Sequence, residues 1–208
     1  KTLKQMTNLK VIGITGSYGK TSTKYIVSTI LSQKYNILKT PKSFNTKMGI
    51  VRTINENLKT TDQIFVCEMG ADEVGEIKTL CDMVHPKYGI LTKVGTAHLE
   101  TFGSRENIQK TKFELIESLP NDGIAILNKD DEWQTSYKLK NDVEVVWIGI
   151  EEKDADVIAK NIITSQELAK MFKERTNISK SYIALVKGKI TKDGIIDNAI
   201  IDYLDGSK

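Results

Sequence analysis

The segment Val11–Thr23, VIGITGSYGKTST, constrains the fold more than any other, because an apolar run leads through a glycine-bracketed loop into a helical pattern. Gly16 and Gly19 lack Cβ atoms, so the backbone can turn sharply and direct consecutive N–H groups at an anion. The helix that begins near Lys20 adds the positive end of its dipole. The segment therefore predicts a strand, an anion-binding loop and a helix in the order that α/β nucleotide-binding proteins use.

The residues of this loop suit the phosphates of a nucleotide and its magnesium ion. Lys20 would hold the terminal phosphates, and the Thr21 hydroxyl would ligate the metal. The strict nucleoside-triphosphatase pattern has a glycine where this chain has Ile14, so an ordinary strand–turn–helix corner remains the alternative. The residues expected to contact the nucleotide are Thr15, Gly16, Ser17, Gly19, Lys20, Thr21 and Ser22.

The composition is that of a soluble globular protein with one α/β core. The chain has 208 residues, of which 39% are hydrophobic and 27% charged, and a net charge of +3, which is too weak to indicate a nucleic-acid partner. No apolar run approaches the length of a membrane span, and the first residues contain no signal-peptide core. We therefore expect a cytoplasmic protein without a membrane partner. Cys67 and Cys81 lack the spacing of a zinc site and are expected to be reduced core thiols.

Apolar runs alternate with helical patterns along most of the chain. This alternation predicts a mostly parallel sheet with helices on both faces. The expected strands are residues 11–15, 36–38, 64–67, 88–92, 124–127 and 143–148, and the expected helical stripes are Ile26, Val27, Ile30 and Leu31, and Val74, Ile77, Cys81 and Val84. Ligands of such sheets bind at the carboxyl ends of the strands, so the chemistry should lie in the loops after Thr15, Cys67 and Thr92.

Three polar residues follow the predicted strands. Glu68 comes directly after an apolar run, where it could ligate magnesium or could equally be a solvated loop glutamate. His98 follows another strand and a glycine, and a lone histidine is more often structural than a ligand. Asn45 could contact a substrate with its amide or could simply form a turn.

Lys112 lies in the apolar stripe of a predicted helix, at helical spacing from Ile108 and Leu115. A lysine on an inward face is costly unless it is paired or chemically altered. Its methylenes could carry the charge to the surface, or the desolvated amine could have a pKa low enough to react.

Five segments in one order resemble the central ATP-binding domain of the Mur ligases: TGSYGKTST, TPKSFN, CEMGADEVGEI, LTKVGTAHLETFGS and QKTKFE. The resemblance covers residues 10–159 and is strongest to the ligases that add D-alanyl-D-alanine to UDP-N-acetylmuramoyl-tripeptide in peptidoglycan precursor synthesis. It implies a P-loop type α/β fold, ATP and Mg²⁺ as cofactors, and a monomer with these two small-molecule substrates. It also implies a reaction in which the peptide carboxylate attacks the γ-phosphate of ATP, and the dipeptide amine then displaces phosphate from the acyl phosphate.

The resemblance assigns roles to the candidate residues. Lys20 would contact the phosphates, and Thr21 and Glu68 would hold one magnesium ion. His98 would help to hold a second. Lys112 matches the family's carbamylated lysine, whose anionic carbamate would bind metal beside His98.

Asn45 would lie near the transferred phosphate or the substrate carboxylate, which makes Lys20, His98, Lys112 and Asn45 the implied catalytic residues. Where the family usually reads Phe-Asn-Asn, this chain has Thr46 as the third residue, which puts the second polar contact in doubt. The family's Gly-x-His-Asn segment and its amino-terminal UDP-sugar domain are missing. We therefore expect a fragment of a ligase.

The tail has a different resemblance and predicts a second segment at residues 160–208, after a first domain at 1–159. It has the pattern of a helix followed by two strands, a short α+β segment, and it resembles the middle of an RluA-type pseudouridine synthase, with Tyr182 at that family's tyrosine. The motif that carries that family's catalytic aspartate is missing. The alternative for the tail is an unusual closing segment of the Mur domain. The alternatives for the function of the chain are a related ligase acting on folate or lipid-linked precursors, an RNA-binding or pseudouridine synthase remnant, or an inactive fragment.

Overall fold

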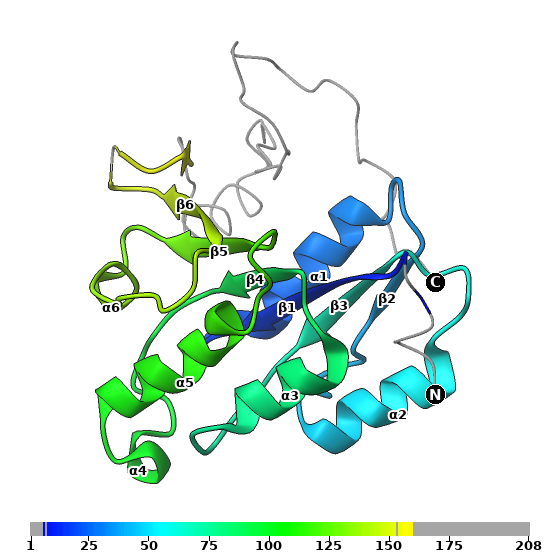
Figure 1. The fold of residues 1–208 in the computed structure, drawn as a ribbon, viewed down its shortest axis with the longest axis horizontal. Coiled ribbons are helices and arrows are strands. Elements are labelled where there is room, and N and C mark those ends of the chain that lie inside the picture. Colours follow the sequence, from blue (N-terminus) through cyan, green and yellow to red (C-terminus); the bar gives the residue numbers. More distant parts are fainter. Residues whose placement is uncertain (1–5, 7, 153, 160–208) are drawn as a thin grey trace, which may run out of the picture.

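A parallel sheet forms the centre of the computed structural model, which describes residue 6, residues 8–152 and residues 154–159 (Figure 1). Its seven strands are β1 (Lys10–Thr15), β2 (Ile37–Lys39), β3 (Ile64–Glu68), β4 (Tyr88–Leu91), β5 (Ile124–Asn128), β6 (Glu144–Gly149) and β7 (Val157–Ile158). They lie in the order β2-β3-β1-β4-β5-β6-β7, and all neighbours pair in parallel. The predicted α/β class and six predicted strands are confirmed; β7 is an addition.

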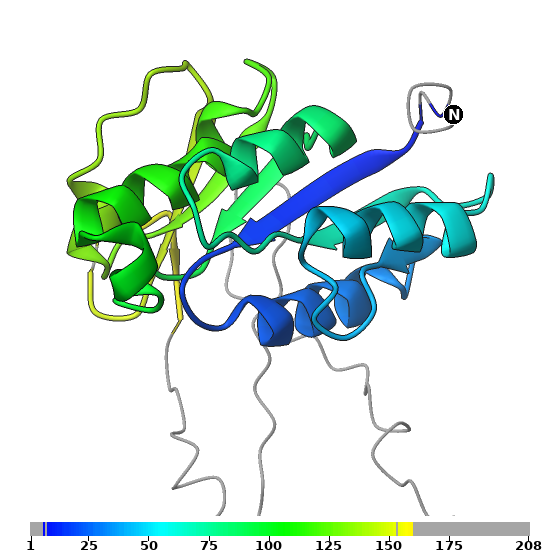
Figure 2. The ribbon, with the colours of Figure 1, turned by 90° about the horizontal axis from the view of Figure 1, so that it is seen from below.

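Helices cover both faces of this sheet, as the alternation predicts. They are α1 (Lys20–Leu31), α2 (Lys47–Asn57), α3 (Glu76–Val84), α4 (Leu99–Phe102), α5 (Arg105–Glu117) and α6 (Glu132–Thr135). Figure 2 shows α3 and α5 on one side of β1 and α1 on the other. Successive strand residues point to opposite faces, so Val11 packs in the cluster that contains α3 and α5, while Ile12 packs in the cluster beside α1.

The stripe predicted for α1 is partly confirmed, because Val27 and Leu31 pack against the cluster on that face of the sheet, but it is wrong at Ile26. Ile26 is 60% exposed, whereas Lys24 and Ser28 are buried. The predicted stripe follows hydrophobicity alone, but α1 turns Lys24 inward to an ion pair with Glu68. Ile26, two residues further along a helix of about 3.6 residues per turn, then points away from the sheet.

The stripe of α3 is confirmed except at its start. Ile77, Cys81 and Val84 are buried, but Val74 lies ahead of the helix and is 48% exposed. Gly75, with φ 94°, separates it from the first helical residue. Cys67 and Cys81 are buried free thiols, as expected.

Helix α2 was not expected from the sequence. Thr46 caps it by accepting a hydrogen bond from Gly49 N, and Ile50 and Thr53 are its buried residues. So few buried apolar side chains make a weak periodic signal. The helix nevertheless matters for the site, because it holds the end of the loop that carries Asn45.

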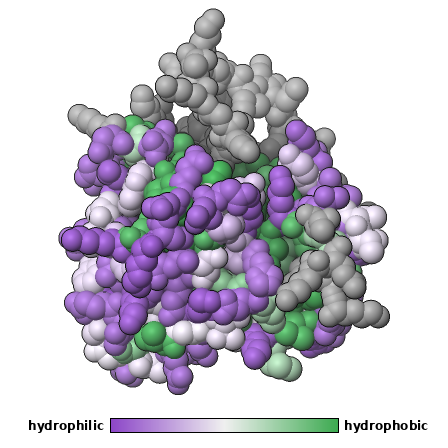
Figure 3. Space-filling model, in the orientation of Figure 1, coloured by the Kyte–Doolittle hydropathy of each residue, from purple (hydrophilic) through white to green (hydrophobic). Residues whose placement is uncertain are grey.

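Among the described residues, no helix combines the length and the apolar character needed to cross a membrane. On the face that Figure 3 shows, the described surface is mainly hydrophilic, with hydrophobic patches between the hydrophilic residues. The helix and strands expected in residues 160–208, and the segment that resembles pseudouridine synthases, lie outside the described residues.

Candidate active site

A pocket of about 460 Å³ lies at the carboxyl edge of the sheet, where the loops after β1, β2, β3 and β4 meet. Four candidate residues from distant parts of the sequence line it: Lys20, Asn45, His98 and Lys112. The loop residues Gly16 and Ser17 also line it, as do Gly70, Ala71 and Asp72 after β3. The parallel topology brings these loops together because every strand ends at the same edge.

The loop between β1 and α1 has the backbone shape that the sequence indicates. Gly16 has a φ of 144° and Gly19 a φ of 81°, both outside the range that other residues readily adopt. Lys20 Nζ donates hydrogen bonds to Gly16 O at 2.7 Å and Ser17 O at 3.4 Å, so the ammonium lies over the loop. Burial lowers the pKa of Lys20, and the charges of Glu68 and Asp72 partly oppose this shift.

This loop is bound to the loop that follows β4. Ser17 N donates to Lys93 O at 2.8 Å, and Gly95 N donates to Ser17 Oγ at 2.9 Å. The Thr92 hydroxyl donates to Tyr18 O at 2.6 Å. The loop between β1 and α1, which we call the phosphate loop, is therefore connected by hydrogen bonds to the segment that leads to His98.

Glu68 is the last residue of β3 and is 1% exposed, which excludes the alternative of a solvated loop glutamate. Its Oε1 accepts hydrogen bonds from Thr21 Oγ1 at 3.0 Å and Asn45 Nδ2 at 3.3 Å. Its Oε2 accepts from Lys24 Nζ at 2.9 Å. Three elements thus converge on one buried carboxylate: α1, β3 and the loop after β2.

The Thr21 and Glu68 oxygens fit a magnesium ion. Mg²⁺ takes oxygen ligands at about 2.0–2.1 Å in octahedral geometry, which separates neighbouring ligands by roughly 3.0 Å. The Thr21 Oγ1 to Glu68 Oε1 distance is 3.0 Å. Within the described part of the chain no three His, Cys, Asp or Glu side chains gather as a metal cluster, so a magnesium ion here would complete its coordination with water or with oxygen atoms of a bound phosphate.

Lys112 points inward from α5, as its position in the stripe predicts. The residue is 3% exposed, its Nζ donates to Ala71 O at 3.3 Å, and the ammonium lies 5.3 Å from the centre of the Phe102 ring. Burial, with a smaller contribution from the Lys20 charge, lowers the pKa of Lys112 to about 8. The alternative that its methylenes carry the charge to the surface is excluded.

His98 lies at the mouth of the pocket and precedes α4 in a left-handed conformation, with φ 62°. Its Nδ1 is 3.2 Å from Asp72 Oδ1, and both side chains are more than half exposed. A left-handed non-glycine residue is uncommon and costs free energy. The carboxylate of Asp72 favours the tautomer that leaves Nε2 unprotonated for another partner.

The comparisons with known proteins show the family to which this chain belongs. The Mur ligase middle domain matches residues 14–190. The chain belongs to the Mur ligase family. A UDP-N-acetylmuramoyl-tripeptide–D-alanyl-D-alanine ligase of Mycobacterium leprae is 44% identical over 123 residues, which are 59% of this chain and 24% of that protein. The corresponding Bacillus subtilis ligase is 38% identical over 122 residues, 59% of this chain and 26% of that protein.

A solved structure gives the same result for the fold of this Mur ligase domain. The MurF ligase of Thermotoga maritima in complex with ADP superposes with a TM-score of 0.69 at 34% identity, over 76% of this chain and 37% of that chain. This chain therefore spans about a quarter to two fifths of the length of these relatives. The fold expected from the motifs is confirmed.

One residue that contacts the candidate site of this Mur ligase domain was not singled out from the sequence. Lys24 is fully buried against Glu68, one helical turn after Lys20. The spacing of four residues puts the two lysines on the same face of α1, which was the available signal. Four of the seven expected nucleotide contacts are not among the residues that line the pocket: Thr15, Gly19, Thr21 and Ser22. Thr15 donates its hydroxyl to Met69 O at 3.0 Å, and Ser22 is exposed on α1.

Proposed function

We propose that this chain is the nucleotide-binding part of an ATP-dependent amide ligase that joins D-alanyl-D-alanine to a UDP-MurNAc-peptide. The observation that carries the proposal is the convergence of Lys20, Thr21 and Glu68 beside a glycine loop with two positive φ angles. The relatives that bear this activity in their names support the choice of substrates. Because the reaction consumes ATP, we propose a cytoplasmic enzyme. We also propose a monomer, as the family resemblance implies.

The phosphates of ATP would bind the loop between β1 and α1. The first N–H groups of α1 have no partner within the helix, and the helix dipole favours an anion at this end. Lys20 would leave Gly16 O and Ser17 O and donate to the terminal phosphates instead, because a charge-assisted hydrogen bond is the stronger one.

Thr21 and Glu68 would hold the magnesium ion, which when bound would spread the negative charge of phosphoryl transfer. Asn45 already donates to Glu68 and lines the pocket, so its amide is within reach of a substrate oxygen there. The substrate carboxylate would attack the γ-phosphorus, with ADP as the leaving group. The dipeptide amine would then attack the acyl carbon, so that a C–N bond forms, the C–O bond to phosphate breaks and the amine loses a proton.

Lys112 and His98 would serve a second metal site. The Lys112 amine would attack the carbon of CO₂, form an N–C bond and release a proton, which leaves a carbamate. Its burial and its pKa of about 8 make the neutral amine available near neutral pH. Labelled bicarbonate should give a ¹³C carbamate resonance in the chain, and its persistence in Lys112→Met would disprove this role.

Calorimetry with ATP and Mg²⁺ tests the nucleotide site directly. The chain should bind ATP with Mg²⁺, and Lys20→Ala should weaken binding at least about tenfold, since a hydrogen bond to a charged group contributes about 1.5–3 kcal/mol. Lys34→Ala, an exposed lysine beyond α1, is the matched control.

The same samples separate this proposal from an RNA-binding function. Binding of RNA would be sensitive to salt, would survive Lys20→Ala and would be lost when residues 160–208 are removed. That pattern, together with no uptake of ATP, would overturn the ligase proposal.

A further inference from the structure

Lys24 is a fully buried lysine that the proposed phosphate and metal contacts do not use. Its Nζ is 2.9 Å from Glu68 Oε2 and donates a second hydrogen bond to the carbonyl of Lys42. The ammonium also lies 5.0 Å from the centre of the Tyr25 ring. A buried charge is costly unless it is paired and hydrogen-bonded, and Lys24 meets both conditions.

The contacts of Glu68 divide its two oxygens between different tasks. Lys24 occupies Oε2, while Oε1 faces Thr21 at 3.0 Å and Asn45 at 3.3 Å. The backbone N–H of Glu68 donates to Thr40 Oγ1 at 3.1 Å, which fixes the end of the strand. Lys24 therefore sets the direction of the carboxylate, with one oxygen held by a cation and the other turned towards the metal-binding hydroxyl.

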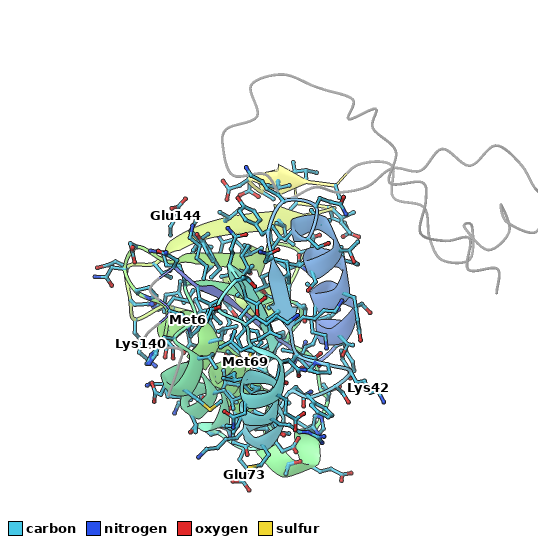
Figure 4. The ribbon with its side chains drawn as sticks, turned by 90° about the vertical axis from the view of Figure 1, so that its right-hand side faces the viewer. Met6, Lys42, Met69, Glu73, Lys140 and Glu144 are labelled. Carbon is cyan, nitrogen blue, oxygen red and sulfur yellow. The ribbon has the colours of Figure 1, made fainter. Side chains whose placement is uncertain are left out.

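Lys24 also donates a hydrogen bond to the loop that carries Asn45. The carbonyl that it binds belongs to Lys42, whose φ of 45° is a left-handed conformation that non-glycine residues rarely adopt. Lys42 lies at the margin of the molecule and Met69, next to Glu68, in its interior (Figure 4). One buried ammonium thus connects an outer loop to the end of a central strand.

The charged side chains around Glu68 set the local net charge that a metal ion encounters. Lys24 already neutralises the carboxylate, and the Lys20 ammonium is close enough for Glu68 to affect its pKa. Asp72 adds one exposed carboxylate at the pocket. A divalent cation that arrives alone meets two lysines beside Glu68, whereas one that arrives with a nucleotide brings several phosphate charges that reverse this balance.

We propose that Lys24 is a positioning residue that aims Glu68 and neutralises it, so that the divalent metal binds together with the nucleotide and not alone. This inference rests on the proposed magnesium–nucleotide site. Its direct consequence is that removal of the Lys24 charge strengthens the binding of metal alone, because Glu68 then lacks a cation.

Electron paramagnetic resonance of Mn²⁺ tests this proposal, since Mn²⁺ accepts the same oxygen ligands as Mg²⁺. Mn²⁺ is titrated into the full chain with and without ATP. The wild type should bind Mn²⁺ at least about tenfold more tightly with ATP than without. Lys24→Met should bind Mn²⁺ alone at least about tenfold more tightly than Lys34→Met, the exposed control, and the double variant K24M/E68Q should lose that gain.

A second readout separates positioning from a merely structural role. Mn²⁺ alone should raise the melting temperature of Lys24→Met but not that of Lys24→Arg, which keeps the charge. A folded Lys24→Met that binds Mn²⁺ no better than the control would overturn the inference.

The wild type keeps the inference testable even if Lys24→Met does not fold. Wild-type chain that binds Mn²⁺ as tightly without ATP as with it would overturn the role of Lys24. Wild-type chain that takes up neither Mn²⁺ nor ATP would overturn the proposed function instead, so the two failures are distinguishable.

Discussion

At the scale of single residues, the site depends on lysines in three different environments. Lys20 is partly exposed and folded over the phosphate loop, Lys24 is paired inside the molecule, and Lys112 is buried with a backbone carbonyl as its hydrogen-bond partner. The three lysines have the same amine group, but each has a different degree of burial and different hydrogen-bond partners. Local sequence indicated Lys20 through its loop and Lys112 through its stripe.

The low pKa of Lys112 makes the stability of the chain depend on pH. Its value of about 8 in the folded chain lies below the ordinary 10.5, so between these values the unfolded chain binds more protons and stability rises with pH. The cost of the buried charge is fully present below pH 8. In CO₂-free buffer, Lys112→Met should stabilise the chain at pH 7 by roughly 1–3 kcal/mol, and the gain should shrink by pH 10.

Urea unfolding of the variant and the wild type at both pH values measures this difference. Lys110→Met, two residues earlier on the exposed side of α5, should show neither the gain nor its pH dependence. An equal gain in the free energy of unfolding at pH 7 and pH 10 would show that the charge of Lys112 does not destabilise the folded chain.

At the scale of elements, the loop after β1 packs on the loop after β4 with little space between them. A Cβ at Gly16 would lie 2.1 Å from Thr92 Oγ1 and 3.0 Å from Lys93 N, whereas a Cβ at Gly19 would meet nothing closer than 3.9 Å. Both glycines have positive φ, so both substitutions carry backbone strain. Only the Cβ added at Gly16 would also collide with a neighbouring atom, Thr92 Oγ1.

Gly16→Ala should therefore abolish nucleotide binding and lower the free energy of unfolding by more than Gly19→Ala, for which strain alone predicts about 1–2 kcal/mol. Thermal melts and calorimetry with ATP and Mg²⁺ measure both effects. Equal losses in the two variants would mean that strain, and not the contact between the loops, sets the shape of the phosphate loop.

The helices differ in how well the hydrophobic pattern of the sequence predicts which of their faces is buried. The stripe of α5 was predictable because Ile108, Leu115 and Ile116 are buried on one face of the helix, with Lys112 among them. The inward face of α1 was predictable only in part, because Val27 and Leu31 pack against the core as expected, whereas Lys24 and Ser28 are its buried residues and Ile26 is exposed. Helix α2 was missed because its buried face is short.

At the scale of the whole molecule, β7 is the last strand of the sheet among the described residues. β7 pairs with β6 through Ile148 and Val157, and Ala159 N donates to Gly149 O at 2.9 Å. The domain boundary at residue 159 remains a prediction, and the family match extends beyond it to residue 190.

A chain that ends at residue 159 should fold and bind ATP with Mg²⁺ as the full chain does, because the pocket is lined by residues 16–112. Cooperative urea unfolding and calorimetry of both chains check this expectation. Loss of cooperative unfolding in the shorter chain would place residues beyond 159 in the same folding unit.

The sequence by itself determined the α/β class, the phosphate loop and the order of the motifs, because these depend on local features: glycine backbone freedom, strand-length apolar runs and helical spacing. Only the tertiary structure decided which distant residues meet. Glu68 could be a solvated glutamate until β3 placed it between Thr21 and Lys24, and that pairing follows from the parallel register of β1 and β3 rather than from either segment alone.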